Sequence, residues 1–291
     1  MNIVVGIGAP VPESPATFDI LRRLGFPDLG IELVHAIAPP IPVGWPAEII
    51  VATETLLWHR ETDGARVLAT MEDLATRNSD LGAMSIALLE GSAADAIVDH
   101  IERDKPQLLA IDATCKGKVE RLLAGSTAQS LVIHSPCPVL VARPQRHPGP
   151  LKAVFATDHS PYAERCAHML AGMAPTGIAS VTVATAWEES RMAAVDALAG
   201  SDSVRPSQAL REALVRRNEM TEKVLESVAL HTHSVLLADD PNNAIQRVVE
   251  ESGADLLILG ARGHGFMDRL SLGSVSMHQA LHSSASVLVL R

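Results

Sequence analysis

Two stretches of this sequence repeat one another: KPQLLAIDATCKGKVERLLAGST, residues 105–127, and GADLLILGARGHGFMDRLSLGSV, residues 253–275. Leu108 aligns with Leu256, so the two copies lie 148 positions apart (256 minus 108). A repeat of this length is long enough to fold around a hydrophobic core of its own. The sequence therefore predicts two tandem domains rather than a solenoid of short units.

The repeat continues to the end of each copy, where PVLVAR, residues 138–143, aligns with SVLVLR, residues 286–291. Between the copies lies the segment RPQRHPGP, residues 143–150. Three prolines and a glycine there prevent a strand or a helix from continuing. The predicted domains are therefore residues 1–143 and residues 150–291.

Within each copy, short apolar runs alternate with stretches of helical periodicity. The second copy is expected to hold strands at Lys152–Thr157, Ser180–Trp187, Ser234–Ala238, Asp255–Leu259 and Val287–Leu290, and helices at Pro161–Met173, Ser207–Leu230, Ala244–Ser252 and Ser274–His282. The first copy is expected to hold strands near Ile3–Ile7, Ile31–Ile37, Met84–Leu89, Leu108–Ile111 and Val139–Val141. Strands that alternate with helices predict parallel pairing, and right-handed crossovers favour a doubly wound sheet. The predicted fold class is α/β, with two tandem doubly wound domains, each a five-stranded parallel sheet flanked by helices.

Composition excludes several classes of function. The chain has 291 residues and a net charge of -10, which disfavours binding to a nucleic-acid backbone. Its three cysteines are far apart in the sequence, so neither a disulfide framework nor a zinc site is expected. The N-terminus MNIVVGIGAP does not resemble a signal peptide, and no apolar run reaches spanning length. We therefore expect a cytoplasmic protein with no nucleic-acid or membrane partner.

A candidate binding segment is LGARGHGFMDRLSLGSV, residues 259–275. In it, Gly260 ends a predicted strand and Gly273 precedes a predicted helix. Glycines allow the backbone to approach a phosphate closely. A helix that begins at Ser274 presents free N–H groups and a partial positive charge to an anion. The Ser274 hydroxyl is placed to cap the helix, to bond to phosphate, or to do both. Each glycine alone indicates only a turn, but together they predict an anion-binding site.

The pattern Gly260-x-x-Gly263-x9-Gly273-Ser274 resembles the ATP-binding signature of the universal stress proteins. The resemblance covers nearly the whole chain, as a tandem pair of such domains with an adenine nucleotide alpha hydrolase-like fold. It extends to an Asp after the first strand, Asp158, and to the closing hydrophobic strand SVLVLR.

This resemblance implies roles for individual residues. Asp158 would hydrogen-bond the ribose or adenine, the backbone of Ala186 would contact the adenine, and Leu259 would pack near the base. The residues implied to cradle the ribose and phosphates are Gly260, Gly263, Gly273, Ser274 and Val275, with His264 near the phosphates. The implied ligand is ATP, with Mg²⁺ or Mn²⁺ held mainly by phosphate oxygens and water.

The first copy departs from the pattern. Asp112 and Cys115 replace two of the glycines, and Gly8 stands where the resemblance expects the acidic residue. Gly125 and Ser126 remain, but alone they indicate only a helix start. A carboxylate at Asp112 is expected to repel phosphate. We therefore predict that the N-terminal domain binds ATP weakly or not at all.

Other polar residues suggest simpler structural roles. His231 and His233 are assigned to a surface loop rather than a metal site, and Asp240, which precedes Pro241, is assigned as a helix cap. Lys116 and Lys118 follow Cys115 and could lower its pKa, but the sequence does not favour a redox role for that cysteine.

Three functions remain open from the sequence. The leading hypothesis is a nucleotide-dependent regulator or sensor of stress, with slow hydrolysis at most, because neither copy has a Walker lysine. The alternatives are an interaction scaffold that binds no nucleotide and a true ATPase or adenylyl-transferring enzyme. The resemblance also implies that residues 139–141 and 287–289 pair within the chain as an internal pseudo-dimer. Two chains could then form a homodimer through exposed edge strands.

Overall fold

The computed structural model describes residues 1–8, 14–37, 53–113, 125–144, 149–187, 206–263 and 272–291, together with Asp196, and gives the backbone alone over residues 53–63. The N-terminal elements are β1 (Asn2–Gly6), α1 (Ala16–Leu24), β2 (Gly30–Ile37), α2 (Thr53–Arg77), the 3-10 turn η2 (Ser79–Leu81), β3 (Ala83–Glu90), α3 (Ala93–Asp104), β4 (Leu108–Asp112), α4 (Ser126–His134) and β5 (Val139–Ala142). The C-terminal elements are β6 (Leu151–Ala156), α5 (Pro161–Met173), β7 (Ile178–Trp187), α7 (Pro206–Leu225), β8 (Ala229–Ala238), α8 (Pro241–Ser252), β9 (Leu256–Gly260), α9 (Ser274–His282) and β10 (Ser286–Leu290). None of the helices in these ranges is long and apolar enough to cross a lipid bilayer.

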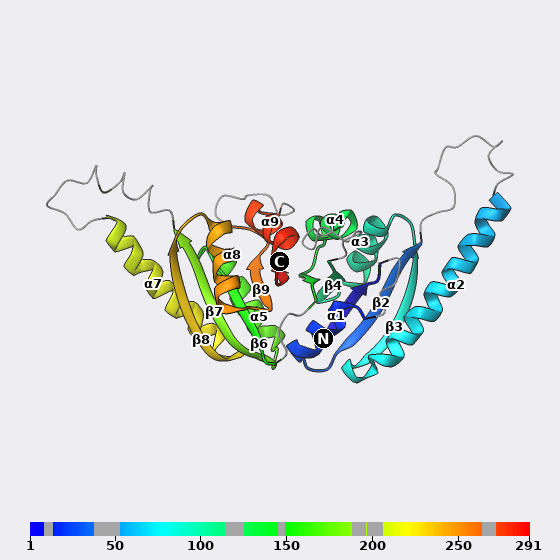
Figure 1. Ribbon diagram of the computed structural model, residues 1–291, viewed down its shortest axis with the longest axis horizontal. Helices are drawn as coiled ribbons and strands as arrows, with labels where there is room; N and C mark the ends of the chain where they lie inside the picture. The colour runs from blue at the N-terminus through cyan, green and yellow to red at the C-terminus, as the bar shows by residue number, and fades with distance from the viewer. Residues whose placement is uncertain are drawn as a thin grey trace.

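All ten strands join one continuous sheet in the order β3-β2-β1-β4-β5-β10-β9-β6-β7-β8. The strands of each domain are parallel to one another, and the two halves meet where β5 pairs antiparallel with β10. Val139 lies opposite Val289, and Val141 lies opposite Val287. Figure 1 shows the result, with α2 and α7 at the two outer ends of the molecule. The α/β fold class and the internal pairing of the final strands are both confirmed.

Helices cover both faces of this sheet, and each face carries one hydrophobic cluster that spans the two domains. The first cluster packs side chains of α1, α2, α5 and α7 against the sheet, with Phe18 and Phe155 among its fully buried members. The second cluster packs α3, α4, α8 and α9 against the other face. Because both clusters cross the β5–β10 junction, the two domains share one continuous core.

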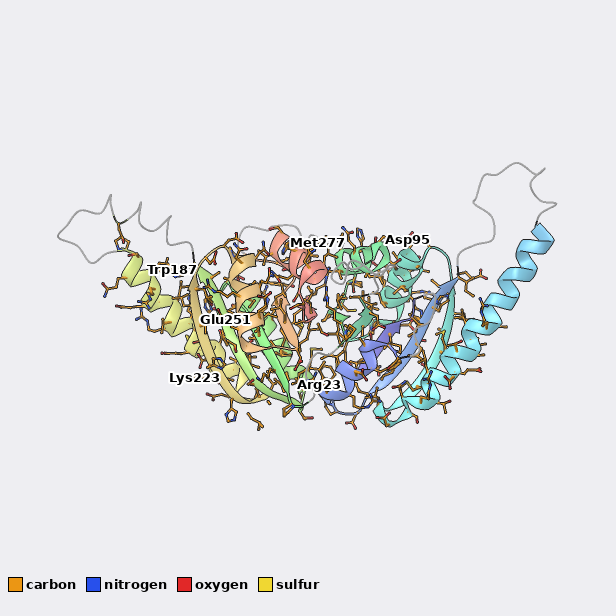
Figure 2. All side chains as sticks on the ribbon, viewed as in Figure 1. Arg23, Asp95, Trp187, Lys223, Glu251 and Met277 are labelled. Atoms are coloured by element: carbon orange, nitrogen blue, oxygen red, sulfur yellow. The ribbon has the colours of Figure 1, made fainter. Side chains whose placement is uncertain are left out.

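Polar contacts strengthen the junction between the domains. Arg23 at the end of α1 forms an ion pair with Asp255, with 2.6 Å between Nη2 and Oδ2, and Asp255 has a side chain only 2% exposed. In Figure 2, Arg23 lies at the meeting point of the two halves. The backbone N–H of Gly177 also donates to the carbonyl of Leu24 at 3.0 Å. A Cβ on Gly177 would lie 1.8 Å from the carbonyl oxygen of Arg23, so only glycine fits there.

Most predicted strands match the observed ones within two residues, but β8 begins at Ala229 rather than Ser234, and α7 ends at Leu225 rather than Leu230. The helical pattern of the sequence extends to Leu230, but this residue lies on the edge strand β8 with its side chain 81% exposed. The ten-residue β7 pairs with β8 along its length, from Ile178 opposite Ala229 to Trp187 opposite Ala238, which extends the strand.

The assignment of His231 and His233 to a surface loop is therefore wrong, because both lie within β8. Nε2 of His233 lies 3.0 Å from the hydroxyl oxygen of Thr182 on the neighbouring strand. This cross-strand contact gives His233 a structural role in the sheet.

Candidate functional site

A pocket of about 290 Å³ lies beyond the carboxyl ends of β6, β7 and β9, next to the first turn of α9. Eight residues singled out from the sequence line it: Asp158, Ala186, Leu259, Gly260, Gly263, Gly273, Ser274 and Val275. The ninth, His264, lies outside the described residues. Arg262, which the sequence indicates as a source of positive charge at the turn, also lines it, and the lining residues that the sequence reasoning missed are Ala156, Thr157, Ala163, Ala184, Pro241, Ile245 and Ser276. Segments far apart in the chain thus meet at one cavity, at the edge of the sheet where ligands of such folds usually bind.

Asp158 follows β6 and has its carboxylate held in place at the mouth of this pocket. Its Oδ1 accepts a hydrogen bond of 3.0 Å from the backbone N–H of Ser160. Ser160 in turn caps α5 by accepting from the N–H of Ala163, and Pro161 occupies the first turn. The other carboxylate oxygen, Oδ2, is directed at Gly263, where an added Cβ would lie only 2.8 Å from it. The residue at position 263 must therefore be glycine if Asp158 is to keep this position.

His159, the next residue, is buried and adopts a left-handed backbone conformation with a φ of 56°. Its Nε2 donates to Oδ1 of Asn218 on α7 at 3.0 Å, and the hydroxyl of Thr185 donates to the same oxygen at 2.7 Å. Arg217 donates to the carbonyl of His159 at 2.9 Å. Burial lowers the pKa of His159, so the ring is neutral near pH 7. This network fixes the backbone that carries Asp158 against α7.

The glycine-rich turn is closed by main-chain and side-chain hydrogen bonds. The N–H of Gly273 donates to the carbonyl of Ala261 at 2.8 Å. The buried hydroxyl of Ser276 donates to the carbonyl of Gly260 at 2.7 Å. A Cβ on Gly260 would lie 3.0 Å from Cε1 of Tyr162, so a side chain there would require the Tyr162 ring to shift by a few tenths of an ångström. Both ends of the turn are thus fixed beside the pocket.

The helix α9 begins at Ser274, as predicted, but Ser274 does not cap it. Gly273 occupies the cap position, with extended backbone angles (φ -65°, ψ 150°) and no side-chain cap hydrogen bond. Ser274 already has helical geometry, and a capping residue must instead be extended. The first intrahelical bond runs from the N–H of Met277 to the carbonyl of Gly273. The N–H groups of Ser274, Val275 and Ser276, in the first turn of α9, therefore lack intrahelical acceptors and can receive an anion.

Arg262 supplies positive charge to the lining of the pocket. Its guanidinium lies 5.6 Å from the centroid of the Tyr162 ring, within the range of a cation–π contact. The Tyr162 hydroxyl donates to the carbonyl of Leu290 at 3.0 Å, which anchors the ring. Burial raises the pKa of Tyr162, so its hydroxyl remains a donor. The arginine is therefore oriented by an anchored aromatic ring.

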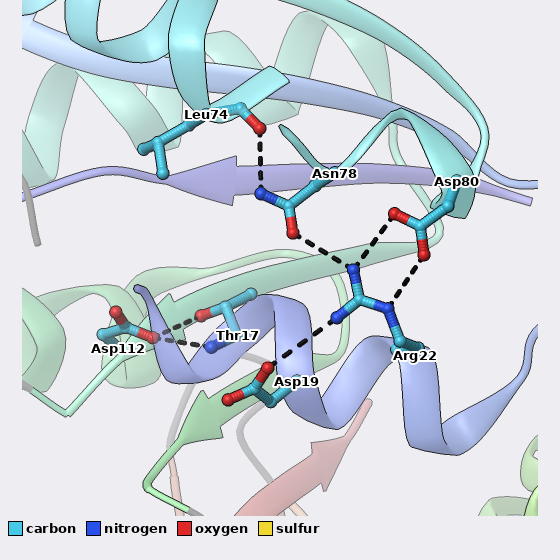
Figure 3. Close-up of polar contacts among 7 residues, drawn as sticks. All are labelled: Thr17, Asp19, Arg22, Leu74, Asn78, Asp80 and Asp112. Carbon is cyan, nitrogen blue, oxygen red and sulfur yellow. Dashed lines mark hydrogen bonds and ion pairs between the residues drawn. The ribbon is translucent and has the colours of Figure 1, made fainter. Parts of the chain in front are cut away.

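The corresponding position in the N-terminal domain is arranged differently. Asp112 accepts hydrogen bonds from the backbone N–H of Thr17 at 2.8 Å and from the Thr17 hydroxyl at 2.6 Å, as Figure 3 shows. Burial raises the pKa of Asp112, while the bonds from Thr17 oppose that shift. The cap residue of α1 is Pro15, whose side chain cannot accept a hydrogen bond. The Asp112 carboxylate thus serves as the acceptor that the first turn of α1 needs, and the expectation that it repels phosphate stays a prediction.

Two predicted helix starts, one in each domain, are confirmed. Gly125 caps α4, which begins at Ser126, so the assignment of a helix start is confirmed. Asp240 caps α8 by accepting from the N–H of Asn242, as predicted, and α8 begins at Pro241. Cys115 lies outside the described residues.

A cluster of side chains on β2 and α3 has the spacing that metal ligands require. Within the described ranges, the group with suitable spacing is Glu32, His100 and Asp104. Nε2 of His100 lies 2.8 Å from a Glu32 carboxylate oxygen and 3.6 Å from a carboxylate oxygen of Asp104, so a hydrogen bond between His100 and Glu32 accounts for their proximity.

Comparisons with known proteins agree with this architecture. The sequence profile of the universal stress protein family matches residues 1–143 and 151–291. A universal stress protein of Mycolicibacterium smegmatis is 23% identical over 308 aligned positions, which cover 100% of this chain and 97% of that protein.

Solved structures support the fold in the same way. A universal stress protein from Archaeoglobus fulgidus superimposes with a TM-score of 0.66 at 17% identity, over 100% of this chain and 98% of the other. The functionally unknown protein PA1789 from Pseudomonas aeruginosa gives a TM-score of 0.65 at 14% identity, over 99% and 92% of the two chains. With the family profile matching both halves, this chain belongs to the universal stress protein family as a tandem member with two such domains.

Proposed function

We propose that the C-terminal domain binds ATP in the pocket beside α9 and that the protein is a nucleotide-dependent regulator or sensor in the cytoplasm. The observation that carries this proposal is the convergence of Asp158, the glycine-rich turn and the open first turn of α9 on one cavity. The pocket thus offers an acidic acceptor at one side and backbone N–H donors at the other. A nucleoside triphosphate has hydroxyl donors and phosphate acceptors in the complementary arrangement.

The residues present fit this ligand. Ala156, Ala163, Ala184 and Ala186 keep part of the lining small and apolar, which suits a flat base. Asp158 is fixed by Ser160 and is placed to accept from the ribose or the adenine. The N–H groups that begin α9 are placed to receive phosphate oxygens. Mg²⁺ or Mn²⁺ would be held mainly by the phosphate oxygens and water.

Hydrolysis is expected to be slow. Among the described lining residues, Asp158 is the only carboxylate, and one of its oxygens is bound to Ser160. The proposal therefore assigns no residue there to activate water. Phosphate release at many turnovers per minute would favour the enzyme alternative instead.

The first test is mass spectrometry of small molecules released from the purified protein. The second is isothermal titration with ATP and Mg²⁺, with GTP as a comparison. The variant Gly263→Asp places a second carboxylate against Asp158, so ATP binding is expected to weaken at least about tenfold. Gly172→Asp is the matched control, because Gly172 is exposed on α5 with nothing within 4 Å of an added Cβ.

Failure of the wild-type protein to bind ATP would refute the proposal and favour the scaffold alternative. Equal weakening of binding by Gly263→Asp and Gly172→Asp would place the nucleotide elsewhere. Homodimerisation remains part of the proposal, and sedimentation of the wild-type chain with and without ATP tests it.

A further inference from the structure

Two arginines at the centre of the sheet each reach into the opposite domain. Arg143 directly follows β5, and Arg291 occupies the same position of the repeat directly after β10. The guanidinium of Arg143 donates to the carbonyls of Ala280 at 2.8 Å and Ala285 at 3.2 Å. Because β5 and β10 are antiparallel, each strand directs the residue after it into the neighbouring domain.

Arg291 makes the reciprocal contacts with the N-terminal domain. Its guanidinium donates to the carbonyls of Val132 and Ile133, the latter at 3.1 Å, near the end of α4. The two helices contacted, α4 and α9, are the equivalent helices of the two repeats. The arrangement is therefore a pseudo-symmetric exchange of arginines across the junction.

Arg143 is well placed to fix α9. It is only 5% exposed, its backbone N–H donates to the Ser286 hydroxyl at 3.0 Å, and the carbonyl of Ala280 belongs to the last turn of α9. The last four carbonyls of a helix have no intrahelical donors. A cation at this end interacts favourably with the helix dipole. Arg143 thus satisfies a carbonyl and supplies positive charge at the end of α9 remote from the pocket.

The other end of α9 lines the pocket. Gly273, Ser274 and Val275 form part of the lining, and Ser276 ties the first turn to the carbonyl of Gly260. With nine residues, α9 is about 13 Å long, so a displacement of its last turn is transmitted along a short rigid helix to its first turn. A small displacement of the N–H groups in the first turn of α9 is therefore expected to weaken their contacts with the phosphates strongly.

We propose that Arg143 is a positioning residue for nucleotide binding, through which the N-terminal domain holds the helix that faces the phosphates in the C-terminal pocket. This inference depends on the proposed function, because it assigns a regulator of affinity to that same pocket. The N-terminal domain, which lacks most of the glycine motif, then contributes to binding without itself holding the nucleotide. Docking of the two domains and affinity for ATP are coupled through one side chain.

The pseudo-symmetry supplies a matched control. Arg143→Met and Arg291→Met each remove a guanidinium from the same junction, buried at Arg143 and partly buried at Arg291, and retain an unbranched apolar side chain. Among the described contacts, Arg143 donates to a carbonyl of α9, whereas Arg291 donates to carbonyls of α4. We expect Arg143→Met to raise the Kd for ATP about three- to tenfold, as loss of a cation from a partly buried helix end predicts, and Arg291→Met to leave it within about twofold. Arg143→Lys retains the charge and is expected to recover part of the affinity.

Hydrogen exchange of the α9 amides provides a readout that does not need a ligand. Exchange at residues 277–282 is expected to be faster in Arg143→Met, whereas exchange in α4 is expected to be faster in Arg291→Met. If the wild-type protein binds no ATP, the proposed function fails, while exchange still decides whether Arg143 holds α9. Equal Kd changes in the two Met variants, or unchanged α9 exchange in Arg143→Met, would overturn the inference.

Discussion

Replacing Gly263 by alanine tests the geometry of the pocket with the smallest possible change. The new Cβ would lie 2.8 Å from Oδ2 of Asp158 and 3.7 Å from its Cγ. An ordinary contact between such atoms begins near 3.4 Å, so the carboxylate must move by several tenths of an ångström. The bond of 3.0 Å from the Ser160 N–H to Oδ1 resists that movement. We expect the Asp158 carboxylate to be displaced from its position at the pocket.

The magnitude follows from the interaction that Asp158 is proposed to make. A hydrogen bond to a charged group contributes about 1.5–3 kcal/mol, which corresponds to a Kd for ATP raised roughly tenfold to a hundredfold. Stability without ligand is expected to change by less than about 1 kcal/mol, because the displaced oxygen is the end of a side chain. Isothermal titration measures the first quantity, and urea unfolding measures the second.

A double-mutant cycle isolates the cause. In an Asp158→Ala background the oxygen that the new Cβ would strike is gone, so Gly263→Ala is expected to have little further effect on ATP binding. The control Gly172→Ala adds the same methyl group where nothing lies within 4 Å and should leave the Kd unchanged. The reasoning is refuted if Gly263→Ala binds ATP as tightly as wild type, or if its effect is undiminished when Asp158 is absent.

Three further predictions concern buried polar groups. Ser276→Ala removes the donor to the Gly260 carbonyl and is expected to destabilise the protein by about 1–3 kcal/mol in urea unfolding; a change below a few tenths would show that the bond is dispensable. Arg23→Ala leaves the Asp255 carboxylate buried without its 2.6 Å ion-pair partner, so a loss of about 3–5 kcal/mol is expected, and Asp255→Asn in the same background should restore part of it. Burial lowers the pKa of His159 below its ordinary 6.5. The unfolded chain therefore binds more protons than the native protein just below that pH. As a result, His159 destabilises the fold progressively as the pH falls from 6.5. Urea unfolding at about pH 7.5 and about pH 5 should therefore show a smaller loss of stability for His159→Gln than for wild type, and equal losses would contradict this assignment.

The sequence predicted those features that depend on local pattern. Apolar runs located the strands, and the 148-residue offset identified two equivalent domains. The glycine motif and the acid after the first strand brought together eight residues that do line one pocket. The prediction of the pocket residues succeeds because a parallel sheet places the carboxyl ends of its strands at one edge, whatever the intervening sequence.

Features that depend on long-range packing were missed. Ala184 and Ile245 line the pocket, but small or apolar side chains in a strand or a helix give no sign of which cavity they border. Arg143 was assigned only to the linker that follows β5. One signal was available, because the same offset aligns Arg143 with Arg291, and an arginine retained after both central strands is unusual for an exposed linker. The contact with Ala280, across 137 positions, required coordinates.

The two copies of the repeat have different packing requirements at one pair of equivalent positions, Gly260 and Asp112. Gly260 leaves room for the Tyr162 ring, and a side chain there would lie 3.0 Å from that ring and 3.1 Å from the Cys166 sulfur. Asp112, at the equivalent position, supplies the acceptor for the first turn of α1, which a glycine could not provide. Exchanging the two residues would therefore crowd one domain and leave a helix end of the other without its acceptor. The N-terminal domain thus has an acceptor for its first helix where the C-terminal domain has a glycine, and under our proposal Arg143 lets the first domain support the pocket of the second.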